Sequence, residues 1–396
     1  MEVSKIKEMF INYYGSDREP LRVFASPGRV NLIGEHIDYC GGPVLPAALT
    51  MKTTIVARKR KDDIIRMRAT DLDVCVETSI SEIQSLKGKL KWGDYQLGVA
   101  DELMKAGYPI CGCDLLYDDT TPHGGGLSSS AAIEVSTALC FATFSNEENG
   151  KADKVVDMIE MALISQKAEH NYIGVNCGIM DQFASAMGKE NHAIYLDCST
   201  LDYELVPLEL GDYRLVLSNT NKKHSLGSSK YNERRSECEA GLSILKQYLP
   251  EIKQLADVTI NDFEIYKNKI EDEVVRKRIK HVVYECDRVH KSVSALKAGK
   301  LEEFGKLMNA SHDSLTSDYE VSCEELDLLA YEARKLDGVL GARMTGAGFG
   351  GCTVSVVKKD VIDEFVEKIG KKYEEKFGHP ASFYISEIGD GGREIK

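Results

Sequence analysis

The sequence predicts an α+β protein of two domains. Short β-branched segments alternate with helical patterns in the first half of the chain, and a new strand pattern, Tyr213–Ser218, follows irregular sequence over Leu201–Asp212. A chain of 396 residues is long enough for two domains. We therefore place a boundary near residue 205, with one domain over residues 1–205 and the second over residues 206–396.

The charge balance excludes partners that need a basic surface. The formal net charge is −13, and 43% hydrophobic with 29% charged residues is ordinary for a globular protein. Nucleic acids and anionic membranes require a basic face, so neither is expected as a partner. The basic run Arg58–Lys61 is followed directly by Asp62 and Asp63, and we interpret it as the solvated end of a strand.

The cysteines and the N-terminus indicate a reducing compartment. The 11 cysteines are spread along the chain without a CxxC pair, which favours free and mostly buried thiols. Met1–Gly15 has the pattern of an amphipathic helix rather than that of a secretion signal, and no run of 18 apolar residues occurs. We expect a cytoplasmic protein.

The segments before residue 121 predict a mixed sheet with one helix beside it. Leu21–Leu32 is apolar on either side of Ser26-Pro27-Gly28, which favours two strands joined by a turn. Trp92–Ala106 has apolar residues at helical spacing. The other predicted strands are Lys52–Lys59, Ile64–Ala69, Val74–Thr78 and Cys113–Tyr117.

A loop at Gly34–Pro43 combines ionisable side chains with turn residues. Glu35, His36 and Asp38 suit a polyhydroxylated ligand, because carboxylates and an imidazole accept hydrogen bonds from several hydroxyls. Their spacing matches no zinc pattern, and hard cations prefer more carboxylates. From these residues alone, a sugar site, a structural polar loop and a metal site all remain open.

The segment Pro122–Ala142 predicts a phosphate-binding loop that leads into a buried helix. The unpaired N–H groups of a helix's first turn and the helix dipole favour an anion there. The alternative is an ordinary turn with capping serines, although capping needs only one such residue. The loop residues are Gly124, Gly125, Gly126, Leu127, Ser128, Ser129 and Ser130.

Two further helices carry candidate site residues. Ala152–Asn171 is an amphipathic helix pattern that ends near Glu169 and His170. Ile179–Gly188 predicts a short helix with Asp181 close to its N-terminus, where the dipole favours a carboxylate. Asp181 is therefore either a catalytic base or a helix cap, and its position alone does not decide between them.

The second half of the chain is predicted to be helical around one glycine-rich hairpin. Helices are expected over Gly227–Leu245, Asp262–Glu332 and Val361–Phe377, with a last strand at Ala381–Ile385. Within Leu340–Val357 the glycines match a dinucleotide fingerprint, but a strand follows where that fingerprint needs a helix. This segment therefore predicts a narrow hairpin against which a nucleotide or another backbone can lie.

Three blocks of this sequence resemble the three motifs of the GHMP small-molecule kinases. They are Gly28–Gly42, Pro122–Ala132 and Arg343–Cys352, in that order. The first, GRVNLIGEHIDYCGG, resembles the signature of the galactokinases, and GVNCGIMDQF and SSKYNERR are also similar to segments of that family. The resemblance implies an N-terminal domain like domain 2 of ribosomal protein S5, a ferredoxin-like C-terminal domain and an active site between them.

The resemblance also implies an activity and its residues. The family transfers the γ-phosphoryl group of ATP to the anomeric hydroxyl of a sugar, with Mg²⁺. Asp181 resembles the base and Arg29 its cationic partner, which would favour the ionised carboxylate. Because that also weakens the carboxylate as a base, Asp181 either takes the proton or mainly orients the sugar hydroxyl. The implied sugar-binding residues are Glu35, His36, Asp38, Gly178 and Tyr231, the implied magnesium ligands are Ser130 and Glu169, and residues 124–130 form the implied ATP loop. Glu134 is a second candidate ligand, because it lies one helical turn after Ser130.

Galactose and ATP are thus the expected partners, and a monomer is expected. Ile37 and Cys40 stand where galactokinase signatures commonly have Thr and Asn, and this form is similar to that of the N-acetylgalactosamine kinases. A kinase for that sugar is one alternative. A sensor that binds the sugar and ATP without catalysis is a second, although the serines of the loop and Asp181 are intact.

Overall fold

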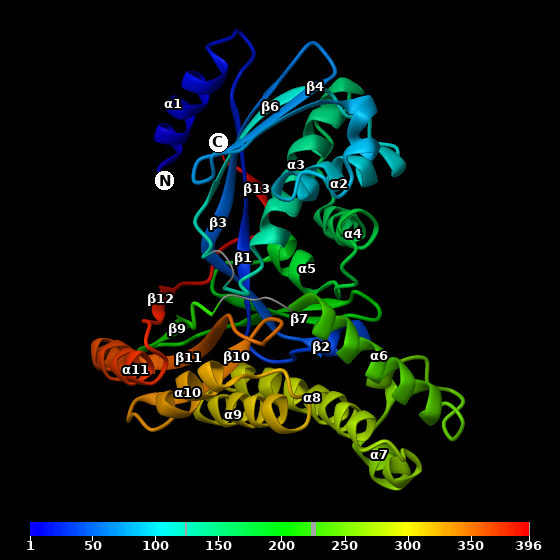
Figure 1. The fold of residues 1–396 in the computed structure, drawn as a ribbon, viewed down its shortest axis with the longest axis vertical. Helices are drawn as coiled ribbons and strands as arrows, with labels where there is room; N and C mark the ends of the chain where they lie inside the picture. The colour runs from blue at the N-terminus through cyan, green and yellow to red at the C-terminus, as the bar shows by residue number, and fades with distance from the viewer. Residues whose placement is uncertain (123–124, 223–226, 396) are drawn as a thin grey trace.

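The computed structural model describes residues 1–122, 125–222 and 227–395, and these form two lobes that lie end to end (Figure 1). The N-terminal lobe is built on a six-stranded sheet with strand order β13-β1-β3-β6-β4-β5. Strands β4 and β6 are parallel and the other neighbours are antiparallel. The strands are β1 Arg22–Asn31, β3 Pro46–Lys59, β4 Ile64–Ala69, β5 Cys75–Ser79, β6 Cys113–Asp119 and β13 Arg393–Glu394.

Strand β1 corrects the prediction of two strands within Leu21–Leu32. It runs unbroken past Pro27, and its pairing with β3 shifts register between Pro27 and Arg29. A bulge tolerates proline because a residue there need not donate to the ladder. The bulge also brings Gly28 against Leu127, whose carbonyl oxygen would lie 2.5 Å from a Cβ at position 28.

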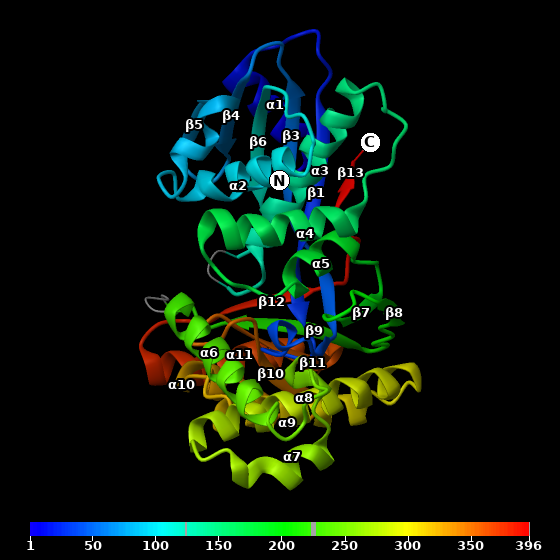
Figure 2. The same cartoon turned by 90° about the vertical axis from the view of Figure 1, so that its right-hand side faces the viewer.

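Most helices of this lobe cover one face of the sheet (Figure 2), whereas the N-terminal helix packs on the opposite face. The amphipathic helix predicted from residue 152 begins only at Met158, because Asp157 caps it by accepting from the backbone N–H groups of Ile159 and Glu160. Val155 therefore lies outside the helix, and its side chain is 87% exposed rather than part of an apolar helix face. The helical elements are α1 Val3–Tyr14, η2 Ile80–Leu86, α2 Trp92–Lys105, α3 Ser129–Glu148, α4 Met158–Ala168, the π-helical turn η3 Glu169–Ile173, and α5 Met180–Met187.

The basic run at the end of β3 is not simply a solvated strand end. Arg58 is buried and pairs with Asp114, its cross-strand partner on β6, through Nη2 to Oδ2 at 2.9 Å. A charge is buried in a protein only where a partner compensates it. The interpretation as a solvated end was therefore wrong for Arg58.

The C-terminal lobe has an antiparallel sheet of order β10-β11-β9-β12 with helices packed on it. The strands are β9 Tyr213–Asn219, β10 Val339–Thr345, β11 Cys352–Lys358 and β12 Ser382–Ser386. The helices are α6 Gly227–Leu245, η4 Leu255–Asp257, α7 Ile260–Tyr266, η5 Lys267–Lys269, α8 Glu273–Lys297, α9 Leu301–Ser317, α10 Glu324–Ala333, η6 Lys359–Val361 and α11 Ile362–Phe377. The glycine-rich hairpin between β10 and β11 is as predicted.

Several connections tie the lobes together. A small sheet of β2 Pro43–Val44, β7 His192–Asp197 and β8 Tyr203–Pro207 lies where they meet, beside η1 Asp38–Cys40. The chain ends in β13, which returns to pair with β1, so the expectation that Ala381–Ile385 is the last strand was wrong. The largest apolar cluster contains Leu45 and Phe183 as well as Ile279 and Val354, which belong to different lobes. The boundary near residue 205 stays a prediction.

The remaining expectations concern thiols and membranes. All 11 cysteines carry free thiols, and more than half of them are buried. Within residues 1–122, 125–222 and 227–395, no helix combines the length and the apolar character that crossing a bilayer requires.

Candidate active site

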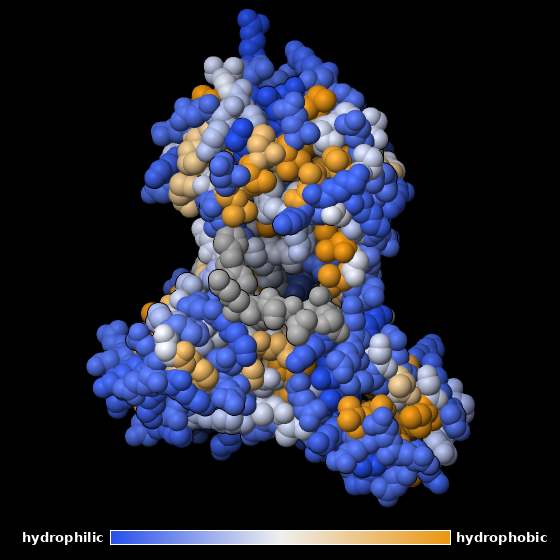
Figure 3. Space-filling view, viewed as in Figure 1, coloured by the Kyte–Doolittle hydropathy of each residue, from blue (hydrophilic) through white to orange (hydrophobic). Residues whose placement is uncertain are grey.

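A cavity of about 460 Å³ lies between the two lobes, within the usual range for a site that binds a small ligand. The space-filling view is hollowed at this waist (Figure 3). The cavity is lined by ten residues that the sequence singled out, which are Arg29, Glu35, His36, Asp38, Gly126, Ser130, Glu169, Gly178, Asp181 and Tyr231. It brings together the loop Gly34–Pro43, which is the predicted sugar-binding loop and is called the sugar loop below, and the predicted phosphate-binding loop that starts at Pro122, called the phosphate loop.

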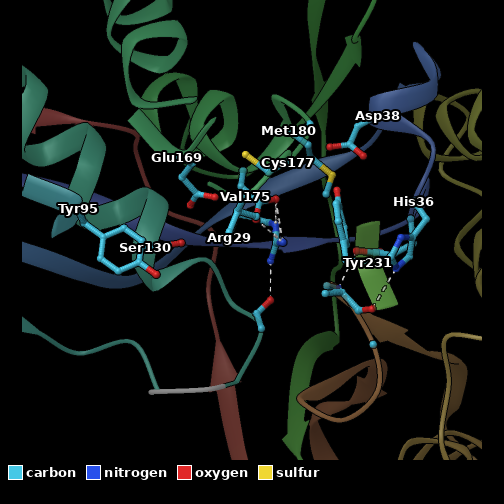
Figure 4. Close-up of a pocket in the computed structure, with 17 residues that line it drawn as sticks. Arg29, His36, Asp38, Tyr95, Ser130, Glu169, Val175, Cys177, Met180 and Tyr231 are labelled. Carbon is cyan, nitrogen blue, oxygen red and sulfur yellow. Dashed lines mark hydrogen bonds and ion pairs between the residues drawn. The ribbon is translucent and has the colours of Figure 1, made fainter. Parts of the chain in front are cut away.

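An ion pair lines the cavity, and Figure 4 shows its arginine, Arg29, near the centre of the residues drawn. Arg29 Nε donates to Asp181 Oδ1 and Nη2 donates to Oδ2, each at 2.8 Å. Ile179, not Asp181, is at the N-cap position of α5, so the capping alternative for Asp181 was wrong. The guanidinium also donates from Nη1 to the carbonyl oxygen of Gly126 at 2.7 Å. Arg29 therefore joins the candidate base to the phosphate loop.

The phosphate loop leads into the N-terminus of α3, as predicted. Helix α3 is buried along most of its 20 residues, with Glu134 among the buried ones. The backbone N–H of Arg29 donates to the carbonyl oxygen of Leu127 at 3.0 Å, and Gly126 has a positive φ of 69°. Gly124 lies outside the described residues. The N-terminus of so long a helix favours an anion, and Ser130 in its first turn lines the cavity.

The three serines have different partners, and none of them is a helix cap. Ser128 is at the N-cap position but makes no capping hydrogen bond, so the interpretation of the serines as caps was wrong. Its hydroxyl donates to Asp181 Oδ2 at 2.6 Å. The hydroxyl of Ser129 donates to Asp119 at the other end of the loop. Only Ser130 lines the cavity.

Oxygen donors gather beside Ser130. Glu169 is buried, and burial raises its pKa, as does the negative charge of Asp181. Glu134 has no exposed surface, and burial and then the neighbouring Glu169 raise its pKa well above the usual value. One of its oxygens accepts from Gln182 Nε2 at 3.2 Å, and the other has no donor among the described residues. This set of hydroxyl and carboxylate oxygens suits a hard divalent cation.

A local distortion of the helix presents Glu169. The α-helical pattern of α4 changes at this residue into the π-helical turn η3, and the N–H groups of Gly174 and Val175 both donate to its carbonyl oxygen, at 2.8 and 3.0 Å. Such turns are frequent at functional sites. Among the described residues, no three His, Cys, Asp or Glu side chains could hold a metal by themselves. Mg²⁺ is typically held by one or two carboxylates together with substrate phosphates, so the donors present fit it.

Glu35 links the first motif to the third. Its Oε1 accepts from the N–H of Gly346 at 2.6 Å, and its Oε2 accepts from Asn31 Nδ2 at 2.9 Å and lies 2.8 Å from Nη2 of the buried Arg343. Burial raises the pKa of Glu35, and Arg343 opposes that effect. Both oxygens are thus engaged within the protein.

His36 offers a ring face to the cavity rather than a free nitrogen. Its Nε2 lies 3.1 Å from the carbonyl oxygen of Ala347, which can only accept, so this nitrogen carries the hydrogen and Nδ1 accepts from the hydroxyl of Tyr39 at 2.9 Å. Burial lowers the pKa of His36 to about 3, which keeps the ring neutral. Its centroid lies 5.4 Å from that of Tyr231.

Asp38 and Gly178 form one wall of the cavity. A Cβ at position 178 would lie 1.8 Å from Asp38 Oδ2, so only glycine fits there. Burial and then the charge of Asp181 raise the pKa of Asp38 to about 7. The Tyr231 hydroxyl stays protonated, because burial raises its pKa well above the usual value.

Helix α8 of the C-terminal lobe holds the sugar loop through two hydrogen bonds. Glu285 Oε1 accepts from the N–H of Gly34 at 3.0 Å, and His281 Nε2 donates to the carbonyl oxygen of Glu35 at 3.0 Å. Both side chains are fully buried. Burial lowers the pKa of His281 to about 4.

Acid is expected to destabilise the protein through His36 and His281. Their folded pKa values lie below the unfolded value of 6.5, so the unfolded chain binds protons first and stability falls as the pH drops below 6.5. The loss is about 2 kcal/mol for each histidine at pH 5. Urea titrations from pH 7 to 5 measure it, and His281→Gln is expected to lessen the dependence. His290→Gln, at an exposed position, is the control, and identical slopes for the two variants would contradict the assignment.

Some cavity residues were given no role by the sequence. They are Tyr95, Val175, Cys177, Met180, Gly346, Ala347 and Gly348. Gly346 and Gly348 belong to the predicted hairpin, and their glycine pattern was the available signal. Tyr95 lies on α2 with its hydroxyl toward Ser130 (Figure 4). Its sequence pattern is that of any amphipathic helix, so no signal marked it.

Comparisons with known proteins show the family of this chain. Residues 8–59 match the model of the galactokinase galactose-binding signature, residues 94–189 that of the GHMP kinase N-terminal domain, and residues 292–375 that of the GHMP kinase C-terminal domain. A galactokinase of Clostridium perfringens is 46% identical over all of both chains, and that of Bacillus subtilis is 44% identical over 99% of each. A crystal structure of Lactococcus lactis galactokinase complexed with galactose superposes with a TM-score of 0.92 at 42% identity, covering 99% of this chain and 100% of that one.

The fold and the two domain models define a GHMP kinase, a class of ATP-dependent phosphotransferases that act on small molecules. Mevalonate kinase has the same fold, with a TM-score of 0.64 at 20% identity over 93% of this chain and 99% of that one. Within this class, the chain belongs to the galactokinase family. The predicted two-domain GHMP kinase fold is thereby confirmed.

Proposed function

We propose that the protein transfers the γ-phosphoryl group of ATP to the C1 hydroxyl of α-D-galactose, giving galactose 1-phosphate and ADP. The observation that carries this proposal is the Arg29–Asp181 pair, which lies in one cavity with the phosphate loop on one side and the sugar loop on the other. The names of the full-length relatives and the galactose in the Lactococcus lactis structure support the sugar.

The chemistry follows from these positions. The C1 oxygen forms a bond to the γ-phosphorus, the bond from that phosphorus to the bridging oxygen breaks, and ADP leaves. Asp181 takes the proton of the C1 hydroxyl, which is a general-base contribution of about 10²–10⁴ in rate. Arg29 and the N–H groups at the start of α3 stabilise charge on the phosphoryl oxygens, which is the main task in phosphoryl transfer.

Mg²⁺ bound to ATP is the proposed cofactor, held by Ser130 and Glu169 with Glu134 behind them. When bound, it neutralises charge on the β- and γ-phosphates. We further propose a monomer in the cytoplasm, where the free cysteines stay reduced.

Measuring ADP formation with Mg-ATP and a panel of sugars tests the proposal. Galactose is expected to have the highest kcat/KM, and no ADP with galactose would contradict it. Ile37 and Cys40 are the two residues that differ from the common galactokinase signature. Both are buried and neither lines the cavity, so they do not favour N-acetylgalactosamine over galactose. The sensor alternative predicts binding of both ligands without turnover in the same assay.

Galactose affinity is expected to rise with pH through about pH 7. Asp38 accepts sugar hydroxyls best as a carboxylate, and its pKa is raised to about 7 by burial, Asp181 and Glu35 against the opposing effects of the Tyr39 N–H and Arg29. Below that pH, binding must displace a proton, so affinity falls about tenfold per pH unit. Calorimetric titration with galactose measures this, and Asp38→Asn is expected to bind weakly with a flat profile. A flat profile in the wild type would contradict the role of Asp38.

A further inference from the structure

Ser128 has a backbone conformation that its residue type does not favour. Its φ of 59° and ψ of 44° lie in the left-handed region, which non-glycine residues adopt uncommonly. Such a conformation costs free energy and persists at functional sites where the surroundings hold it. A glycine would make this turn without strain. The serine side chain therefore needs a reason other than the turn.

The hydrogen bond that its hydroxyl donates supplies that reason. Ser128 is 7% exposed, and its Oγ donates to Asp181 Oδ2 at 2.6 Å. This is a hydrogen bond to an ionised acceptor, which is shorter and stronger than a neutral one. The carbonyl oxygen of Ser128 also accepts from the N–H of Ala132 at 3.0 Å, the first bond of α3, so its backbone is fixed by the helix.

Counting acceptor positions on Asp181 shows what this contact does. A carboxylate has about two acceptor positions on each oxygen. Oδ2 accepts from Ser128 and from Arg29 Nη2, so both of its positions are filled. Among the described residues, the one hydrogen bond that Oδ1 accepts comes from Arg29 Nε, and Nη2, which donates to Oδ2, lies 2.8 Å from Oδ1, so one acceptor position remains there. Asp181 is 32% exposed at its side chain, toward the cavity.

We propose that Ser128 is a positioning residue, whose hydroxyl fixes the Asp181 carboxylate so that Oδ1 alone receives the proton of the sugar hydroxyl. The inference rests on the proposed function, because it takes Asp181 as the base. It separates the three serines by task, since the hydroxyl of Ser129 joins the two ends of the phosphate loop and Ser130 faces the cation donors. Without the Ser128 hydroxyl, Oδ2 would compete for the proton and the carboxylate could rotate away from the attacking oxygen.

Two variants distinguish the hydroxyl from the backbone. Ser128→Ala removes the hydroxyl and keeps the strain, whereas Ser128→Gly removes both, so glycine is expected to be the more stable of the two. If the hydroxyl matters, both variants lower the single-turnover rate of phosphoryl transfer to a similar extent, about 10-fold to 100-fold. Galactose affinity by calorimetry and KM for ATP are expected to stay close to the wild type.

A double-mutant cycle gives a readout that a merely structural role would not produce. With Asp181→Asn as the second change, removing the Ser128 hydroxyl is expected to cost no further rate, because its partner is gone. Independent, multiplying losses in the cycle would overturn the inference, as would wild-type transfer rates in Ser128→Gly. Wild-type protein that forms no ADP with any sugar contradicts the proposed function and the inference with it, whereas an active wild type beside a fully active Ser128→Gly contradicts the inference alone.

Discussion

Replacing Asp181 with asparagine is expected to lower kcat by about 10³-fold or more while galactose binding persists. Asparagine has nearly the same shape but cannot take the proton of the C1 hydroxyl. Its amide nitrogen would also face donors, since Arg29 Nη2 and Ser128 Oγ both point at Oδ2. Proton transfer and the orientation of the attacking hydroxyl are lost together.

Rapid-quench measurement of galactose 1-phosphate and calorimetric titration with galactose separate these effects. Asp181→Ala is expected to match the asparagine variant in rate, because both lack the base. Asp153→Asn, at an exposed loop position that does not line the cavity, is the matched control. Near-normal kcat in Asp181→Asn would remove this residue from the mechanism, and loss of galactose binding would show that its main contribution is to hold the sugar.

The variant is also expected to be less stable by about 1–3 kcal/mol, because the Arg29 side chain is 4% exposed and loses its anionic partner. Thermal unfolding measures this. The rate loss is expected to remain when the rate is measured well below the unfolding temperature, which separates catalysis from stability.

The local patterns of this chain predicted its elements well where each pattern had one physical cause. Helix α3 is apolar on almost every side and is buried as expected, and the hairpin after Thr345 follows from a strand that begins directly after glycines. The prediction failed where distant parts of the chain decide the structure. Proline and glycine normally end a strand, yet β1 continues because the phosphate loop packs against Gly28 and makes the bulge favourable.

In the candidate site, too, local sequence predicted the residues but not their partners from distant parts of the chain. Asp181 was predicted equally as base or cap. The fold excludes the cap and brings Arg29, 152 residues away in sequence, to Asp181, whereas its role as base stays a proposal. Glu35 and His36 lie in the cavity as the motif indicated, but their partners Gly346 and Ala347 come from more than 300 residues further along the chain. Sequence spacing could not reveal that Gly346 occupies one oxygen of Glu35 and that Ala347 occupies one nitrogen of His36.

Replacing Arg29 is expected to cost as much activity as replacing Asp181, by a different route. Arg29→Met removes the cation that contacts both the phosphate loop and Asp181, and a kcat loss of about 10³-fold or more is expected. Arg29→Lys keeps the charge, but one ammonium group cannot reproduce the paired bonds to Asp181 and the bond to Gly126 in the same geometry. We expect its kcat to be about 10²-fold below the wild type.

The same change reaches the sugar site through charge. Arg29 is one of the groups that hold down the pKa of Asp38, so in Arg29→Met that pKa rises above its value of about 7. The midpoint of galactose affinity against pH then moves to higher pH, and binding at neutral pH weakens, whereas Arg29→Lys leaves the midpoint near the wild type because the charge remains. Calorimetry across pH with Arg18→Met as the exposed control measures the shift. An unmoved midpoint in Arg29→Met, together with a large loss of kcat, would mean that Arg29 acts on the phosphoryl group and Asp181 alone, and that Asp38 titrates independently of it.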